Sequence, residues 1–136
     1  MTSFNTNKQV DIAILDFSKA FDTVPHNTQL HKLNDYSITG DLHKWLTTFL
    51  SHRQMTVVIE GTSLEATTVD SGVPQGTVLL FLCHINDLPQ TVKSQVRLFA
   101  DDCLLYREIN GQNDHHTLQN YLKNLEEWAN TWGMRF

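Results

Sequence analysis

The sequence predicts an α+β domain in which helices pack on one face of an antiparallel sheet. Short apolar runs of strand character are mixed with helical stretches but do not alternate regularly with them, which argues against a βαβ architecture. No linker, repeat or low-complexity tract divides the 136 residues, enough for one domain with one core. The hydrophobic fraction of 40% and charged fraction of 18% are ordinary for a globular protein.

The first half of the chain predicts one strand followed by two helices. Val10–Phe17 has the length and composition of a buried strand, and Ser18–His26 breaks it. Thr28–Tyr36 predicts a short helix. A second helix is expected to start at an Asp41 N-cap and to end near Ser51. Its apolar residues recur at helical spacing and are expected in the core: Leu42, Trp45, Leu46, Phe49 and Leu50.

The middle of the chain predicts a hairpin, a loop and a helix. Gln54–Glu60 and Leu64–Asp70 have strand character and flank a turn at Gly61-Thr62. Ser71–Gly76 is a loop by composition. Thr77–Asp87 is apolar and is expected to form a buried helix that ends before a proline.

A second hairpin and a long helix complete the pattern. Val96–Ala100 and Cys103–Arg107 are expected to pair around a tight turn formed by Asp101-Asp102. The last helix is expected to start at an Asp114 N-cap and to end with Gly133 at C′. Its apolar stripe consists of Leu118, Tyr121, Leu122, Leu125, Trp128, Ala129 and Trp132.

Charge and cysteine content limit the function classes. The net charge of −5 argues against a self-sufficient nucleic-acid binder, although it is compatible with part of one. Cys83 and Cys103 lie in apolar runs, which favours buried thiols in an intracellular setting, cytoplasm or nucleus. No apolar run is long enough to span a membrane, so no membrane partner is expected. The seven histidines show no zinc-ligand spacing with the cysteines.

Three aspartates stand out because they follow or interrupt apolar runs. Asp16 ends the first strand, while Asp101 and Asp102 lie between two apolar segments. Carboxylates in such places are costly to desolvate, and adjacent ones repel each other. A divalent cation such as Mg²⁺ relieves both costs. Strand-end caps and turn residues would explain the same aspartates without a metal, so their positions alone leave both readings open.

Three segments occur in the order of a known family. LDFSKAFD (Leu15–Asp22), SGVPQG (Ser71–Gly76) and FADD (Phe99–Asp102) resemble motifs A, B and C of reverse transcriptases from LINE-like, non-LTR retrotransposons. TVPH, INDLP and WANTWGMRF fit the same family. The resemblance implies the palm subdomain of right-hand polymerases and an RNA-directed DNA polymerase that adds dNTP to a DNA primer on an RNA template. Residues 1–136 would then be a partial domain holding motifs A to C and the helix before motif D.

The resemblance also implies a metal site. Asp16, Asp101 and Asp102 match the catalytic carboxylates, and the backbone carbonyl of Phe17 matches a further ligand. The family uses two Mg²⁺ ions, with Mn²⁺ as a possible replacement. Such an ion pair stabilises the attacking and leaving oxygens of a phosphoryl transfer. We therefore expect the three carboxylates to gather at neighbouring strand ends.

Nucleotide binding is implied for a second group of residues. Phe21 matches the bulky residue that stacks under the incoming sugar and disfavours ribonucleotides. Gln75 and Gly76 match the motif B loop that contacts nucleotide and template, and Phe17 lies next to the motif A aspartate. Asp22, the last residue of motif A, is expected to act as a structural cap or ion-pair partner.

Two departures from the family bear on activity. Gly72–Leu82 reads GVPQGTVLLFL, whereas family members usually carry three more residues, resembling Gly-Pro-Leu. Such a loss rotates the rest of a helix by about 60°, which puts the reach of Gln75 and Gly76 in doubt. We also expect the fingers, thumb and endonuclease regions of the family to be missing from this chain. We therefore expect the isolated chain to be inactive. The alternatives are a non-catalytic retroelement remnant that binds nucleic acid weakly at most, and a small acidic interaction domain with coincidental motifs.

Overall fold

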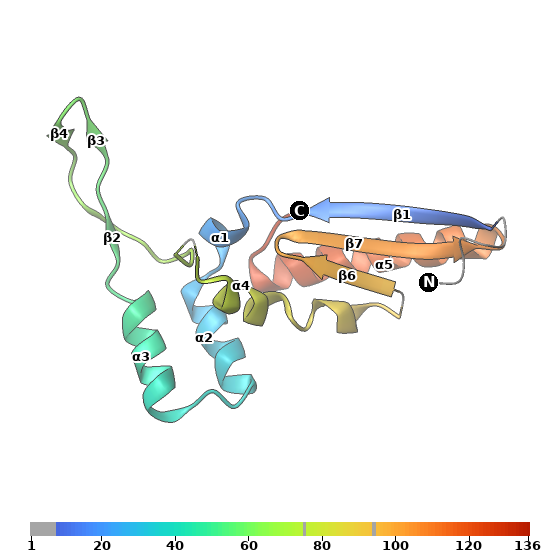
Figure 1. Ribbon diagram of the computed structural model, residues 1–136, viewed down its shortest axis with the longest axis horizontal. Helices are drawn as coiled ribbons and strands as arrows, with labels where there is room; N and C mark the ends of the chain where they lie inside the picture. Colours follow the sequence, from blue (N-terminus) through green and yellow to red (C-terminus); the bar gives the residue numbers. More distant parts are fainter. Residues whose placement is uncertain (1–7, 75, 94) are drawn as a thin grey trace. The chain divides into compact units, whose positions relative to one another are not determined.

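The computed structural model describes residues 8–74, 76–93 and 95–136, in two compact units (Figure 1). The sheet unit comprises the chain up to Ala20 together with Ile85–Phe136. The helical unit comprises Phe21–His84. Each unit is described by itself. Helices and antiparallel strands occur together, as the predicted α+β class requires.

The sheet unit is built on three antiparallel strands. They are β1 (Gln9–Asp16), β6 (Gln95–Phe99) and β7 (Asp102–Ile109), in the order β1-β7-β6 (Figure 1). Strand β7 lies in the middle and pairs along its whole length with β1. The first strand and the second hairpin were therefore predicted correctly to within two residues.

Helix α5 (Gln112–Trp132) lies behind the sheet and packs on β7 (Figure 1). It buries an apolar face that includes Leu125 and Trp128. On the opposite face of the sheet the side chains of Ile12, Ile14 and Phe99 are 55%, 71% and 63% exposed. The prediction of helix packing on one face is thus confirmed for this unit. The 3-10 helix η2 (Leu88–Thr91) also contacts α5.

The ends of α5 differ in how well the sequence predicted them. Gly133 adopts the left-handed conformation at the C-terminus (φ 72°), as predicted. The predicted Asp114 N-cap is wrong, because Gly111 occupies that position. Asp114 lies in the first turn, where its carboxylate accepts hydrogen bonds from the Asn110 N–H (3.0 Å) and the Arg107 guanidinium (2.7 Å). Both bonds lower the pKa of Asp114, the backbone bond from Asn110 most strongly.

The helical unit contains α2 (His26–Asp35) and α3 (Gly40–Leu50), with the short α1 (Ala20–Thr23) at its beginning and α4 (Val78–Ile85) at its end. Two side chains on one face of α2 bond to carbonyl oxygens of α4. The Gln29 amide donates to Leu80 (2.9 Å), and the buried Lys32 ammonium donates to His84 (2.5 Å).

Three sequence expectations for the helices need correction. The N-cap of α3 is Thr39, and Asp41 lies in the first turn. In α3 only part of the predicted stripe is buried, since Leu42 and Trp45 are 56% and 59% exposed. Helix α4 is shorter than predicted, and Leu79 is 74% exposed on it. Periodicity identified the helices, but it could not show that the neighbouring surface is too small to cover each apolar face.

The predicted middle hairpin is an exposed arm with two short ladders. Strand β2 (Gln54–Met55) pairs with β5 (Thr67–Thr68), and β3 (Val58–Ile59) pairs with β4 (Thr62–Ser63). Its tip is at residues 60–61, one residue earlier than predicted. In Figure 1 the arm continues from α3. Among the described residues, no helix is both long and apolar enough to cross a lipid bilayer.

Candidate functional site

Two of the three predicted aspartates face each other across neighbouring strands. In the antiparallel ladder of β1 and β7, Asp16 is paired with Asp102. Residues directly opposite each other in such a ladder have Cα atoms about 4.5–5.5 Å apart and side chains on the same face. Residues 86 positions apart in sequence (102 − 16) thereby become nearest neighbours. Both side chains are exposed.

Asp101 lies in the hairpin turn beside this pair. The turn consists of Ala100 and Asp101, because Asp102 is already paired with Phe99 in the β6–β7 ladder. The prediction that Asp101-Asp102 forms the turn is therefore wrong by one residue. Ala100 takes a left-handed φ of 53°, which a residue with a Cβ adopts at a cost of about 1–2 kcal/mol. The Asp101 carbonyl accepts a hydrogen bond from the Phe17 N–H (3.2 Å), which ties the turn to the end of β1.

Phe17 anchors this end of β1 in the core. Its ring is only 2% exposed, stacks on Phe136 at 4.5 Å between ring centroids, and lies 6.2 Å from Trp128. The next residue, Ser18, donates its N–H to the Arg135 carbonyl (2.8 Å). Figure 1 accordingly shows the C-terminus beside the end of β1. With the ring buried, the main chain is the part of Phe17 that can meet a ligand.

The oxygen atoms of these carboxylates are the kind of ligand that a hard cation prefers. Like charges directly opposite each other on two strands are destabilising, and carboxylate oxygens are the ligands that Mg²⁺ prefers. Asp101 is half-buried at the turn next to the facing Asp16–Asp102 pair. Within the described ranges, however, no three His, Cys, Asp or Glu side chains are gathered so that they could hold a metal ion. The backbone thus sets two carboxylates side by side with a third nearby.

The predicted nucleotide-binding residues are divided between the two units, since Phe17 lies in the sheet unit and the others fall in the helical unit. Phe21 is half-buried, and its ring lies 5.0 Å from that of Phe81. Gly76 has a φ of +95°, and a Cβ added there would meet no atom within 4 Å. Gln75 lies outside the described residues. The helical unit therefore holds Phe21 and Gly76, and the sheet unit holds the aspartates.

The end of motif A and the start of motif B are joined within the helical unit. The Val73 N–H donates to the Phe21 carbonyl (2.7 Å), and the Gly72 N–H donates to the Val24 carbonyl (2.8 Å). The Ser71 hydroxyl donates to the Asp22 carbonyl (3.1 Å). Asp22 thus takes part through its main chain. Sequence reasoning missed this junction, because no local pattern reports hydrogen bonds between segments some fifty residues apart.

Gly72 lies close to the backbone of the end of motif A. Its φ is +88°, and a Cβ there would lie 3.0 Å from the Asp22 carbonyl oxygen. It would also lie 3.2 Å from the Asp22 Cα and from the Phe21 carbonyl oxygen. All three atoms belong to the backbone and cannot rotate away. The glycine of SGVPQG is therefore required by packing as well as by its dihedral angle.

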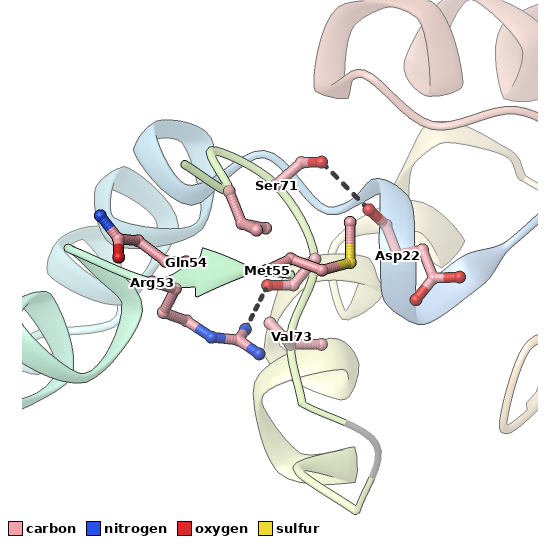
Figure 2. A pocket seen from close by; sticks show the side chains of 8 residues that line it. Asp22, Arg53, Gln54, Met55, Ser71 and Val73 are labelled. Atoms are coloured by element: carbon pink, nitrogen blue, oxygen red, sulfur yellow. Dashed lines mark hydrogen bonds between the residues drawn. The ribbon is translucent and has the colours of Figure 1, made fainter. Parts of the chain in front are cut away.

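A pocket of about 230 Å³ opens beside this junction (Figure 2). Its lining combines one acid, one base, two uncharged polar side chains and apolar residues, contributed by Asp22, Arg53, Gln54, Met55, Val69, Ser71, Gly72 and Val73. In Figure 2 the Arg53 guanidinium reaches toward the junction, where it donates to the Gly72 carbonyl (3.2 Å).

The cysteines are free thiols. Cys103 is fully buried on the α5 side of β7, and burial raises its pKa from 9.0 to about 11. Burial also raises the pKa of Cys83, which is only half-buried. Both thiols are therefore protonated and weakly nucleophilic near neutral pH.

Comparisons with known proteins agree with the motifs. The family described as "Reverse transcriptase (RNA-dependent DNA polymerase)" matches residues 2–136. The "Probable RNA-directed DNA polymerase from transposon X-element" of Drosophila melanogaster is 27% identical over 143 residues, covering 98% of this chain and 16% of that protein. The "RNA-directed DNA polymerase from mobile element jockey" of the same fly is 30% identical over 142 residues, covering 95% of this chain and 15% of that protein. The chain thus spans about 15–16% of the length of these relatives.

Proposed function

This chain belongs to the reverse transcriptase family, and we propose that it is the palm of an RNA-directed DNA polymerase from a non-LTR retrotransposon. The observation that carries this proposal is the pairing of Asp16 with Asp102 at the end of β1, with Asp101 in the adjacent turn. Family motifs far apart in sequence thereby meet on one end of a sheet. The reaction would be transfer of a deoxynucleotide from dNTP to a primer 3′-hydroxyl on an RNA template.

The carboxylates of Asp16, Asp101 and Asp102, with the Phe17 carbonyl, would hold two Mg²⁺ or Mn²⁺ ions. When bound, such ions supply charge neutralisation and lower the pKa of the attacking hydroxyl. The protein's own part is to fix these oxygens. Pairing of β1 with β7 holds Asp16 against Asp102, and the buried Phe17 ring stops the end of β1 from shifting along its partner.

The open face of the sheet fits the role of a platform for primer and template. The apolar side chains of Ile12, Ile14 and Phe99 lie on it, and the facing aspartates lie at one end. Apolar surface left uncovered on a protein commonly marks a place where another molecule docks. In the helical unit, Phe21, Gln75 and Gly76 would contact the incoming nucleotide.

We further propose that the protein works in an intracellular setting. We also propose that the isolated chain is inactive and needs the regions that its longer relatives carry beyond the matched segment. A net charge of −5 gives little hold on a nucleic-acid backbone, so basic surface has to come from elsewhere. The shortened segment after Gly76 adds a second defect. The alternative is a non-catalytic remnant that retains the fold.

Primer extension on an RNA template with Mg²⁺ tests the proposal. Three versions of the chain would be assayed. The first is the chain as it is, the second carries Gly-Pro-Leu inserted after Leu79, and the third is joined to the fingers and thumb regions of a jockey-type relative. Extension by the joined protein that Asp101→Asn abolishes supports the polymerase. Asp11→Asn, in β1 but at its far end, is the matched control and should retain activity.

Mn²⁺ binding to the isolated chain, followed by electron paramagnetic resonance, provides an independent reading. Wild type should bind Mn²⁺, and Asp102→Asn should weaken binding at least tenfold, while Asp11→Asn should not. Binding without extension by any version identifies the remnant. If wild type does not bind Mn²⁺ and no version extends a primer, the polymerase proposal is refuted.

A further inference from the structure

We propose that His26 and Arg53 are positioning residues that clamp the Gly72 carbonyl and thereby fix the position of Phe21. The inference rests on the proposed function in one respect, since it assumes that Phe21 selects the incoming nucleotide. The hydrogen bonds that carry it all lie within the helical unit.

His26 supplies the shorter of the two bonds to this oxygen. Its ring is buried, with 8% exposed, and the Nε2 atom lies 2.8 Å from the Gly72 carbonyl oxygen. A carbonyl oxygen can only accept, so Nε2 must carry the hydrogen. A buried side chain of limited rotamer freedom then defines where the carbonyl points. The histidine lies at the start of α2, whose register is set by the bonds from Gln29 and Lys32 to α4.

Arg53 approaches the same oxygen from the base of the arm. Its guanidinium donates to the Gly72 carbonyl (3.2 Å), and its own carbonyl accepts the Val69 N–H (2.9 Å). The two donors come from residues 26 and 53 and converge on residue 72 (Figure 2 shows the Arg53 bond). A carbonyl oxygen has two lone pairs, and both are used here.

The clamped peptide transmits this constraint to Phe21. Fixing the Gly72 carbonyl fixes the plane of the Gly72–Val73 peptide, because the peptide group is rigid. The N–H of that same peptide is the Val73 N–H, which donates to the Phe21 carbonyl (2.7 Å). The path is therefore two side chains, one planar peptide and one hydrogen bond. A rotation of the peptide would lose the bond that holds the Phe21 backbone.

The chain offers a matched control for His26. His43 also bonds a backbone carbonyl in the helical unit, with its Nε2 atom 3.2 Å from the Leu30 oxygen. Removal of either imidazole takes away one bond from Nε2 to a backbone carbonyl, and removal of His43 also takes away a contact between its Nδ1 atom and the Thr47 hydroxyl (3.5 Å). Of the two histidine bonds, the one from His26 reaches the peptide that contacts Phe21, and the one from His43 does not.

Hydrogen exchange of the full chain tests the clamp without any need for activity. His26→Leu should speed exchange of the Val73 and Gly72 amides about tenfold, the effect of losing one hydrogen bond to a buried carbonyl. Exchange of the Cys103 and Leu105 amides should not change. His26→Gln places a donor at similar reach and should stay within about twofold of wild type, and His43→Leu should leave Val73 unaffected. Equal acceleration at Val73 by His26→Leu and His43→Leu, or none by His26→Leu, overturns the clamp.

Nucleotide selection tests the consequence in the joined, extending protein described above. His26→Leu and Arg53→Met should raise KM for dGTP about tenfold with a smaller change in kcat, and should raise GTP incorporation relative to dGTP. His26→Gln should restore the wild-type ratio. If His26 had a purely structural role, His26→Leu would instead lower kcat for both nucleotides alike, which is the result expected for His43→Leu. Such a result for His26→Leu refutes positioning. If the joined protein without substitutions extends no primer, the proposed function fails. Hydrogen exchange alone then decides whether the clamp exists.

Discussion

Replacement of Gly72 by alanine should destabilise the helical unit by about 2–5 kcal/mol. One part is conformational, since a residue with a Cβ pays about 1–2 kcal/mol in the left-handed region that φ +88° requires. The other part is steric. The new methyl would lie 3.0 Å from the Asp22 carbonyl oxygen and 3.2 Å from two further backbone atoms. Overpacking of this kind costs about 1–3 kcal/mol, because the segments must separate and the bonds between them lengthen.

Gly40→Ala separates these two contributions. Gly40 lies in the same unit at a φ of +68°, and a Cβ there would meet nothing within 4 Å. Its replacement should therefore cost only the conformational part. Urea unfolding of both variants, followed by circular dichroism and by exchange of the α2 amides, measures the difference. If Gly72→Ala costs no more than Gly40→Ala, the close approach of motifs A and B is not a constraint on this fold.

Three further predictions concern other charged or titratable groups. Asp102→Asn should raise the free energy of unfolding by about 0.5 kcal/mol in metal-free buffer, because it removes like-charge repulsion with the facing Asp16. Thermal unfolding measures this change, and a loss of stability would contradict the repulsion. The bonds from Asn110 and Arg107 lower the pKa of Asp114 from 3.8, so its stabilising contribution is present above pH 3.8 and is lost as pH falls through the lowered native value. Acid unfolding should show this loss in wild type and less of it in Asp114→Asn. For Cys103, whose pKa is raised from 9.0 to about 11, stability is full below pH 9 and should decline between pH 9 and 11. Cys103→Ala should lack that decline, and a thiol reagent at pH 8 should modify Cys83 well before Cys103; the reverse order argues against the buried thiol.

Much of the sheet unit could be predicted from the sequence, because local patterns specify it. Strand character located β1, β6 and β7, and a left-handed glycine ended α5 at Gly133 as expected. The hairpin turn was misplaced by one residue. An Asp-Asp pair is a good turn sequence, whereas the structure places Ala100 in the left-handed position and Asp102 in the strand. Pairing with β1 along its whole length decides this register, and that pairing is a tertiary interaction.

The errors at helix starts have a similar origin. Asp41 and Asp114 were expected as N-caps from residue type alone, yet Thr39 and Gly111 hold those positions without a side-chain bond. Asp114 is used one turn later, because Arg107 of β7 stands within reach of its carboxylate. The residue at the N-cap and the bonds of the nearby aspartate thus depend on which groups the tertiary structure brings within hydrogen-bonding distance.

The candidate site was predictable as a set of residues and only partly as an arrangement. The resemblance to reverse transcriptases selected Asp16, Asp101 and Asp102, and the ladder of β1 and β7 brings Asp16 opposite Asp102. The bonds from His26 and Arg53 to Gly72 join positions 46 and 19 residues apart, and nothing in the composition of TVPH or SGVPQG reveals them.

The alternation of side chains along β7 determines which insertions and deletions are compatible with the fold. Even-numbered Asp102 faces outward, and its odd-numbered neighbour Cys103 is buried against α5. An insertion or deletion of one codon within the strand would exchange their sides, presenting a thiol to solvent and driving a carboxylate into hydrocarbon. Copies drifting without selection should therefore tolerate length changes in the exposed arm, whereas a single added residue in β7 would disrupt both the pairing of Asp16 with Asp102 and the buried face of the sheet.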